Sequence, residues 1–375
     1  MLSQDAMREE FPVIDEVTYL NNAAQCPVPR RTVDRIGQIT ESLGRPHVEP
    51  NVSGEIEEAR RKLALLMNAQ SEEITFVANT SEGVSLAASS LPLRANDNVL
   101  IPDPEHPSLV YPWLNLQCKG VEVRRVRWNG PGLAVEDIFS SIDARTRVVA
   151  LSDVQWTNGF RQDLKALGSF CRDREIFLVV DAIQSLGVLP VDVRECHISI
   201  LVAGGYKWLL AGRGNGCMFV HEDVVQKMSP PLVGRHGVRG IHSAGGLCFH
   251  GDARRFSTGA WNLPGIMALG SSVGLLLECG VEDIARRVGD LSQDLMRGVE
   301  GLGLDITSPR RPVHPSAIVS FTTGDSITDG QLVSELASHN VYLALRGRGL
   351  RAAVNFYNRE RDVDRTVEVL RHILQ

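Results

Sequence analysis

The stretch that decides the fold reads IFLVVDAIQSLG from Ile176 and continues, after a connector, as ISILVAGGYKWLL from Ile198. Its two apolar runs, residues 176–180 and 198–203, have the length and β-branched content of buried strands. Asp181 closes the first run, and Lys207 lies four residues past the second. Open α/β sheets place their sites at the carboxyl ends of strands, so we expect this acid and this lysine to share a site.

Pyridoxal phosphate catalysis needs this pair of groups. A lysine amine forms a Schiff base with the aldehyde, and a carboxylate keeps the pyridine nitrogen protonated so that the ring becomes an electron sink. For either residue taken alone, a helix cap at Asp181 or a solvated loop position at Lys207 is the more common case.

The motifs around the pair carry a resemblance. VDAIQSLG followed by GGYKWLLAGRGNGCMFV is similar to the class V aminotransferase family, which includes cysteine desulfurases, isopenicillin N epimerase-like enzymes and carbon–sulfur lyases. The likeness runs from about Tyr19 to the C-terminus. It implies a pyridoxal 5'-phosphate enzyme of fold type I, usually a homodimer.

Composition sets the outer bounds. A chain of 375 residues with 43% hydrophobic and 22% charged residues predicts a globular protein with one large and one smaller domain. A net charge of −6 argues against a nucleic-acid partner. The seven cysteines are scattered without a CxxC pair, so we expect neither a metal site nor disulfides, and a cytoplasmic setting. The polar start MLSQDAMREEF is unlike a signal peptide, and no apolar run suits a membrane.

Strand and helix patterns alternate from residue 73 onward, which predicts a mostly parallel α/β sheet covered on both faces. A helix is expected over 53–68, capped by Ser53. Residues 233–259 are glycine-rich and predict a long loop or a hairpin. We expect a large cofactor-binding α/β domain over 16–264, with 1–15 and 265–375 forming a small α+β domain. The expected strands of the large domain are 74–78, 98–101, 121–126, 148–152, 176–180, 198–203 and 217–220.

Several residues match cofactor-binding positions of the family. The turn NTSEG precedes a helix, and helix N-terminal amides with hydroxyls can cradle a phosphate. The same turn is an equally good cap, but the resemblance assigns the phosphate to Thr80 and Ser81. It implies that His106, just beyond a strand, stacks on the pyridine ring and can relay a proton. It also implies that Gln184 approaches the phenolic oxygen of the cofactor.

The chain departs from the desulfurase pattern at several positions. Gly204 and Tyr206 replace the Ser and His of Ser-x-His-Lys, so one phosphate hydroxyl is lost. Ala260 replaces a Thr that reaches the partner subunit's cofactor phosphate, a contact that neighbouring Thr258 could replace. Trp156 stands where desulfurases have an Asn, and we expect it to form an aromatic wall.

The substrate side is predicted from two further motifs. LRAAVNFYN matches the motif in which an Arg, here Arg351, grips the substrate carboxylate bidentately. YLNNAA matches a segment that enters the active site, which makes Asn22, Ala23 and Ala24 substrate-side candidates together with Tyr206. Arg346 and Arg348 crowd the same LRGRGLR stretch. One of them could bind a second anionic group of the substrate, or both could be solvated loop residues.

Desulfurases carry a mobile cysteine shortly before that Arg, and this chain has none there. Because a thiolate must take up the sulfur, the missing cysteine rules out cysteine desulfuration on physical grounds. We expect an enzyme that forms an external aldimine with an amino acid and reacts it at Cα or Cβ. Carbon–sulfur β-elimination is preferred by analogy. Transamination and epimerisation use the same residues, and a non-catalytic sensor of pyridoxal phosphate or an amino acid is the alternative outside enzymes.

Overall fold

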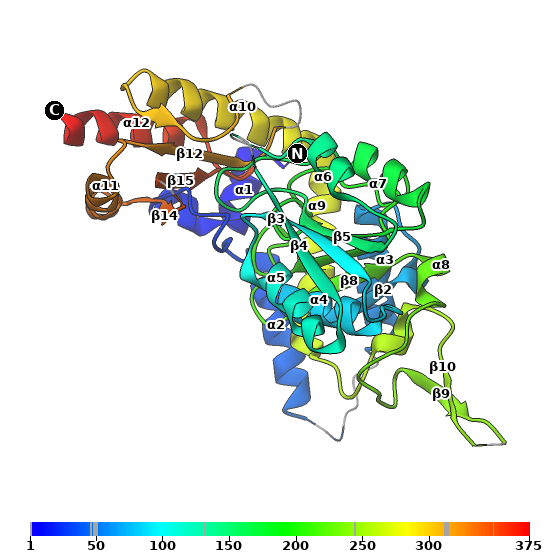
Figure 1. Cartoon of the computed structure of the whole chain (residues 1–375). Coiled ribbons are helices and arrows are strands. Elements are labelled where there is room, and N and C mark those ends of the chain that lie inside the picture. The colour runs from blue at the N-terminus through cyan, green and yellow to red at the C-terminus, as the bar shows by residue number, and fades with distance from the viewer. Residues whose placement is uncertain are drawn as a thin grey trace.

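The computed structural model describes residues 2–45, 47, 52–128, 130, 132–243, 245–310, 315–347 and 349–375. A seven-stranded sheet with helices on both sides forms the larger part, and a four-stranded sheet lies beside it (Figure 1). The cores of both sheets are continuous in one cluster of buried residues.

The large sheet has the order β2-β8-β7-β6-β5-β3-β4. The four pairings from β7 to β4 are parallel, while β8 pairs antiparallel with both β7 and β2. This confirms the mostly parallel sheet, and each of the seven expected strands is found within two residues of its expected ends. Their bounds are β2 Ile74–Val77, β3 Asn98–Asp103, β4 Glu122–Arg127, β5 Thr146–Ser152, β6 Phe177–Asp181, β7 Ile200–Gly204 and β8 Gly216–Val220.

Both faces of this sheet are covered, which explains the continuous apolar runs. Successive side chains of a strand point to opposite faces. Val148 and Ala150 pack in the cluster that contains Trp113 of α5, whereas Val149 and Leu151 pack in the cluster that contains Leu167 of α7. The helices along this part are α3 Ser53–Leu66, α4 Thr80–Ser90, α5 Pro107–Leu114, α6 Val135–Ser141, α7 Leu164–Arg172 and α8 Glu222–Val225.

The prediction that Ser53 caps α3 was wrong. Ser53 is the first residue of the helix, Val52 precedes it, and no side chain among the described residues accepts a hydrogen bond from the first turn.

Short 3-10 segments lie at η1 Pro12–Asp15, η2 Ser71–Glu73, η3 Asn115–Lys119 and η4 Ala253–Phe256.

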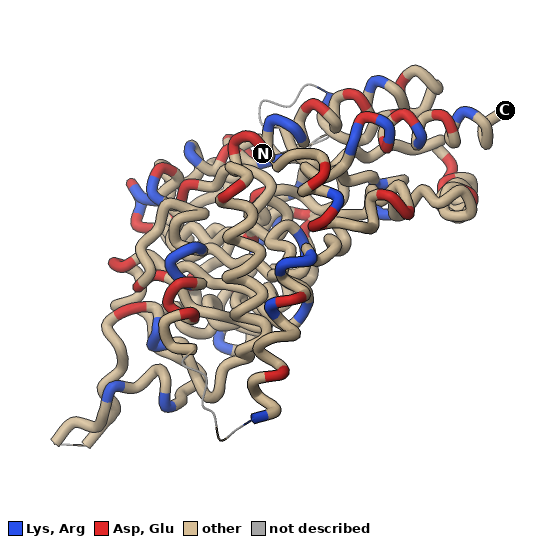
Figure 2. Tube along the Cα trace, turned by 180° about the vertical axis from the view of Figure 1, so that it is seen from behind, with Lys and Arg blue, Asp and Glu red and all other residues tan. Residues whose placement is uncertain are grey.

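The smaller sheet is antiparallel, with the order β11-β12-β15-β14. Its helices α10 and α12 lie side by side over it (Figure 1), and Arg287 of α10 pairs with Glu360 of α12. Figure 2 shows basic and acidic positions interspersed along these two helices. The bounds are α10 Val281–Glu300, β11 Asp305–Ile306, β12 Ile318–Thr322, α11 Ser326–Ser338, β14 Ala344–Arg346, β15 Gly349–Ala353 and α12 Glu360–Leu374.

The N-terminal segment joins the two parts. β1 (Thr18–Tyr19) pairs in parallel with β13 (Val341–Tyr342), and Asn21 bridges to Ala353 of β15. α1 (Gln4–Glu10) precedes it, and α2 (Arg30–Leu43) follows it and packs with α3 against α9 (Leu263–Cys279). The expected division at residues 16–264 stays a prediction.

A hairpin of β9 (Val238–Ile241) and β10 (Leu247–Phe249) forms within the glycine-rich region and extends away from the large part (Figure 1). The sequence predicts either a long loop or a hairpin over residues 233–259, and the structure contains the hairpin. Ile241 and Leu247 are exposed on it.

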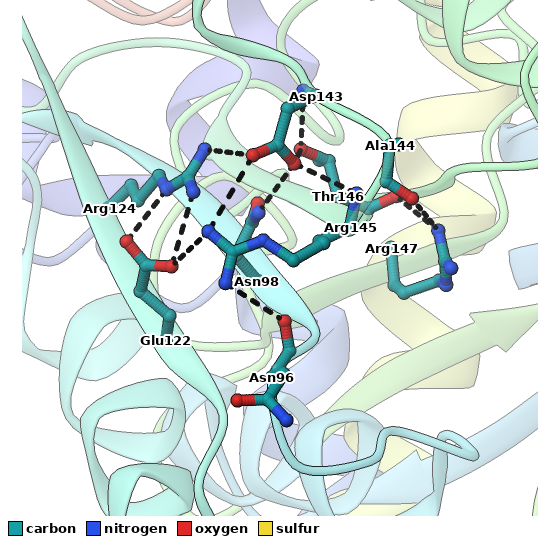
Figure 3. A network of polar contacts seen from close by, with 9 residues as sticks. All are labelled: Asn96, Asn98, Glu122, Arg124, Asp143, Ala144, Arg145, Thr146 and Arg147. Carbon is teal, nitrogen blue, oxygen red and sulfur yellow. Dashed lines mark hydrogen bonds and ion pairs between the residues drawn. The ribbon is translucent and has the colours of Figure 1, made fainter.

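A polar network ties the N-terminal ends of three parallel strands together (Figure 3). Asp143, before β5, accepts from Asn98 of β3 and pairs with Arg124 of β4 at 2.9 Å. Arg145 reaches Glu122 at 3.1 Å. The hydrogen bond from Asn98 is the largest factor that lowers the pKa of Asp143. This end of the sheet is therefore stabilised by ion pairs and lies opposite the carboxyl ends.

No single helix among the described residues has the length and apolarity to cross a membrane. α9 and α10 satisfy these criteria only as a pair, which is bent by 76°.

Candidate active site

A cavity of about 130 Å³ opens at the carboxyl ends of the parallel strands. Ser152 and Asp181 end β5 and β6, and the segments after β2, β3 and β7 supply most of the remaining wall. The residues that line it are Asn79, Thr80, Ser81, His106, Ser108, Ser152, Trp156, Asp181, Ile183, Gln184, Tyr206 and Lys207.

Asp181 and Lys207 meet in this cavity, as the sequence predicts. Asp181 is buried and accepts a hydrogen bond from the Ile183 amide at 3.0 Å. Burial raises the pKa of Asp181 to about 6, against the lowering effects of the Ile183 amide and Lys207. Burial likewise lowers the pKa of Lys207 to about 8, and the Asp181 charge opposes that shift. A buried amine that loses its proton near neutral pH can act as a nucleophile or a base.

The turn between β7 and β8 holds Lys207. The amide of Gly205 donates to the Asn215 carbonyl, and the amide of Ala211 donates back to the Gly205 carbonyl, both at 2.8 Å. A Cβ at Gly205 would lie 1.8 Å from Asn215 Oδ1, so a larger residue here would force the Asn215 side chain to move. Trp208, next to the lysine, is buried and donates to Gln184 at 3.0 Å. Lys207 therefore stands on a rigid turn.

The start of α4 forms one end of the cavity. Asn79 caps the helix by accepting from the Glu82 amide. Thr80 Oγ1 is buried and has no hydrogen-bond partner within the described part of the chain, while Ser81 is exposed. A Cβ at Gly204 would lie 3.3 Å from both Thr80 Oγ1 and the Tyr206 ring. The glycine that replaces the serine of desulfurases therefore leaves only a narrow space between these two side chains. An orphaned hydroxyl at a helix N-terminus suits an anionic group such as a phosphate.

An aromatic wall faces the lysine. The rings of His106 and Trp156 meet edge to face with centroids 5.4 Å apart. His106 caps α5, and its Nδ1 accepts from the Ser108 amide at 3.2 Å, which leaves Nε2 to carry the proton of the neutral ring. Burial, then the charges of Lys207 and Arg351, lower the pKa of His106. The buried Nε1 of Trp156 has no partner among described residues.

Arg351 lies on β15 beside this wall. Its side chain is buried, Nη1 donates to the Trp156 carbonyl at 2.7 Å, and Nε has no partner among described residues. Burial lowers the pKa of Arg351 to about 10. The ring centroid of Tyr206 lies 5.7 Å from Lys207 Nζ. Burial raises the pKa of the Tyr206 hydroxyl. A buried guanidinium without a carboxylate partner is suited to bind one from a ligand.

Two substrate-side predictions do not fit the structure. Asn22 is fully buried. Its Nδ2 donates to the Ala353 carbonyl at 2.8 Å and to Asn358 Oδ1 at 3.2 Å, and its Oδ1 accepts from the Tyr357 hydroxyl. Ala23 is also buried, and its carbonyl accepts from Gln184 Nε2 at 3.1 Å. These residues join the N-terminal segment to the core instead of facing a ligand. Gln184 does line the cavity, with its amide oriented by Ala23 and Trp208.

Two more predicted residues lie elsewhere. Thr258 is exposed and lines a separate cavity of about 190 Å³, together with Ala260 and Glu82 of α4. Arg348 lies outside the described residues.

The sequence reasoning missed Glu105 and Cys26. Glu105 is buried beside His106 and accepts from the Ser152 amide at 2.9 Å. Burial, together with the charge of Asp181, raises the pKa of Glu105 to about 7, against the lowering effect of hydrogen bonds from Ser152 and His106. Cys26 is buried, and burial raises the pKa of its thiol despite the nearby Lys207 charge. The position of Glu105 directly before His106 could have marked it as a candidate site residue. No sequence pattern around Cys26 indicated a place near the site.

The residues present fit pyridoxal phosphate. Thr80 and the α4 amides offer a phosphate site, Lys207 an amine, Asp181 a buried acid, and Trp156 and Arg351 unpaired donors. Thr80 and Trp156 line this cavity, and Arg351 is bonded to the Trp156 carbonyl beside it. Each carries a buried polar atom without a partner among the described residues, although buried polar groups normally have partners.

Comparison with known proteins identifies relatives over nearly the full length. The family model for aminotransferase class V matches residues 18–367. A probable cysteine desulfurase of Methanothermobacter thermautotrophicus is 28% identical over 98% of this chain and 97% of its own.

Solved structures share the fold. The apo cysteine desulfurase of Thermococcus onnurineus NA1 has a TM-score of 0.91 at 23% identity, covering 100% of this chain and 98% of that one. The cystine C-S lyase C-DES, in complex with cysteine persulfide, has a TM-score of 0.88 at 22% identity, with 96% and 99% covered.

The names of these relatives conflict with one inference from the sequence. Several are cysteine desulfurases, although the missing loop cysteine had led us to rule out cysteine desulfuration. That exclusion is withdrawn, and desulfuration returns as an alternative.

Proposed function

This chain belongs to the aminotransferase class V family and is a pyridoxal phosphate enzyme of fold type I, and from that premise we propose that it cleaves a carbon–sulfur bond of an amino acid by β-elimination. The observation that carries the proposal is the buried pair of Asp181 and Lys207 near the guanidinium of Arg351, which has no carboxylate partner among the described residues. Such a site can hold an amino acid and remove its Cα proton.

Each residue has a proposed role. When bound, the cofactor supplies an electron sink for charge that develops at Cα. Asp181 holds the proton on the ring nitrogen, and Thr80 with Ser81 holds the phosphate. His106 would cover one face of the ring, and Gln184 would approach the phenolic oxygen, because both line the cavity. These groups are fixed by strands and helix starts, so little reorganisation is needed.

Lys207 first holds the cofactor and then works as a base. Arg351 orients the substrate carboxylate, which fixes the Cα–H bond relative to Lys207. With its pKa lowered by burial, the Lys207 amine would take the Cα proton. The freed electron pair would form the Cα–Cβ double bond as the Cβ–S bond breaks, and the departing thiolate would take the proton back from the Lys207 ammonium to leave as a thiol. We propose that Tyr206, whose ring lies beside the amine, contacts the leaving group.

Desulfuration is the second candidate, because the relatives are desulfurases. It would leave sulfur on a protein thiolate as a persulfide. Cys26 is the described cysteine that couples electrostatically to Lys207, but burial keeps its thiol protonated. This favours elimination, in which sulfur leaves as a thiol or sulfide. Transamination and epimerisation share the same residues.

Product analysis tests the proposal. Holoenzyme is incubated with L-cysteine, cystine and S-alkyl cysteines, and keto acid, ammonia, thiol and alanine are measured. We expect pyruvate, ammonia and the matching sulfur product in equal amounts, which is sulfide from L-cysteine, cysteine persulfide from cystine and a thiol from the S-alkyl cysteines. Alanine with protein-bound sulfur that disappears in Cys26→Ser would instead support desulfuration. An amino-group acceptor requirement would support transamination.

We also propose a cytoplasmic homodimer. The support is that Thr258 lies close to Ala260, which holds the family position that serves the partner's cofactor, and that Thr258 is exposed and does not line its own chain's Lys207 cavity.

A further inference from the structure

Two arginines share one face of the small sheet. Ala344 is the register partner of Arg351, and Arg346 is the partner of Gly349. The side chains of register partners point to the same face, so Arg346 and Arg351 are diagonal neighbours on adjacent strands. The Cα atoms of such neighbours are about 7–8 Å apart. Arg351 is buried, whereas Arg346 is exposed.

This face lies against the wall of the Lys207 cavity. Ser320, the β12 partner of Arg351, donates to the Thr157 carbonyl at 2.6 Å. Arg351 donates to the carbonyl of Trp156, which lines the cavity. A Cβ at Gly347, next to Arg346, would touch the Thr157 side chain at 3.4 Å. The β14–β15 hairpin therefore stands directly beside the wall of the cavity that Trp156 forms.

The two guanidiniums lack a counter-charge. Neither Arg346 nor Arg351 forms an ion pair with a carboxylate within the described ranges. Arg346 donates instead to the carbonyl of its neighbour Leu345 at 2.8 Å. The charge of Arg346 also reaches the site, since it lowers the pKa values of both Lys207 and Arg351. A ligand with two negative groups would relieve this repulsion.

We propose that Arg346 binds a second anionic group at the far end of the substrate side chain, while Arg351 holds the α-carboxylate. The inference rests on the proposed function and narrows its substrates to dianionic amino acids, such as cysteine with an S-linked carboxylate. The deep arginine takes the end next to Cα, and the exposed one takes the end at the mouth. Arg348, the alternative to Arg346, lies outside the described residues.

Binding to the holoenzyme tests this without turnover. Succinate and succinamate differ by one charge, and neither has an amine to react with the cofactor. We expect calorimetry to show succinate binding about tenfold to a hundredfold more tightly to the wild type, and this preference to vanish in Arg346→Gln. The matched control is Arg371→Gln, at an exposed arginine of α12, which should keep it.

A kinetic arm uses S-carboxymethyl-cysteine and its uncharged match, S-carbamoylmethyl-cysteine. Arg346→Gln should raise KM for the charged substrate by a similar factor and leave kcat within about twofold. Equal binding of succinate and succinamate by the wild type, or a preference that survives in Arg346→Gln, would overturn the proposal. If neither cysteine derivative is cleaved but the binding preference holds, β-elimination fails and the anion site stands.

Discussion

Asp181 and Lys207 each shift the pKa of the other toward its charged form, in a cavity whose burial pushes both toward neutrality. The two sit on different strands, at the end of β6 and just past β7, so their proximity is set by the parallel pairing of those strands. Because burial and the partner's charge act in opposite directions, both pKa values lie near neutral pH. A proton can then be gained or lost at a small free-energy cost.

Replacing Lys207 tests its role as the cofactor-holding amine. Lys207→Ala should lose the visible absorbance of covalently held pyridoxal phosphate, and turnover should fall by roughly 10²–10⁴-fold or more. Spectroscopy and mass analysis after borohydride reduction measure both effects. Lys227→Ala, at an exposed lysine, is the control and should behave as wild type. Retention of the absorbance in Lys207→Ala would refute the assignment.

Replacing Asp181 separates cofactor binding from chemistry. Asp181→Asn keeps a side-chain oxygen for the Ile183 amide but loses the negative charge. We expect the cofactor to stay bound while kcat falls at least about a hundredfold, because the ring nitrogen loses its counter-charge. Asp103→Asn, at the end of β3, is the strand-end control. Wild-type turnover in Asp181→Asn would contradict the role.

The lowered pKa of Lys207 predicts how cofactor capture depends on pH. Only the neutral amine attacks an aldehyde, and an ordinary lysine with a pKa of about 10.4 is almost fully protonated at pH 8. Because the pKa of Lys207 is about 8, the capture rate of the apo-protein should rise through pH 8 and level off above it.

Asp181 provides the internal check on that profile. Its negative charge raises the pKa of Lys207, so in Asp181→Asn the rise should move to lower pH. Stopped-flow absorbance at a series of pH values measures both curves. A wild-type rate that climbs steadily to pH 10 would show that the amine is not perturbed.

The sequence revealed the large sheet and most of the cavity because both depend on local patterns. Buried parallel strands read as continuous apolar runs, and the residues that follow them, such as Asp181 and His106, must then lie at one edge. Asn22 was misjudged because its partners, among them Ala353, lie more than 300 residues away in the chain. Such contacts leave no local pattern, and the same holds for the pairing of Gln184 with Ala23.

His106 can be tested for its two separate contributions. His106→Asn should keep the α5 cap but lose the ring, so cofactor affinity should fall. His106→Phe keeps a ring but loses the cap at a cost of about 1 kcal/mol of stability, and it removes any proton relay. We expect bound cofactor but a kcat roughly tenfold to a hundredfold lower in His106→Phe.

His221 is the matched control for His106. It caps α8 in the same way, with Nδ1 accepting from the Asp223 amide at 3.2 Å, but it does not line the cavity. His221→Phe should lose similar stability without loss of turnover. If His106→Phe retains full kcat, the imidazole takes no part in proton transfer.

The last prediction concerns the partner subunit. If Thr258 serves the cofactor phosphate of a second copy, Thr258→Val should weaken cofactor binding about tenfold, the loss of one hydrogen bond to a charged group. Mixing Thr258→Val with Lys207→Ala subunits provides a sharper test. In a mixed dimer, the site that keeps Lys207 receives Thr258 from the other chain, so cofactor affinity at that site should return to the wild-type value. Cofactor titration of purified mixed dimers measures this. An affinity that stays weak would place Thr258 outside the partner's site, and a fully active monomer at high dilution would remove the need for a partner.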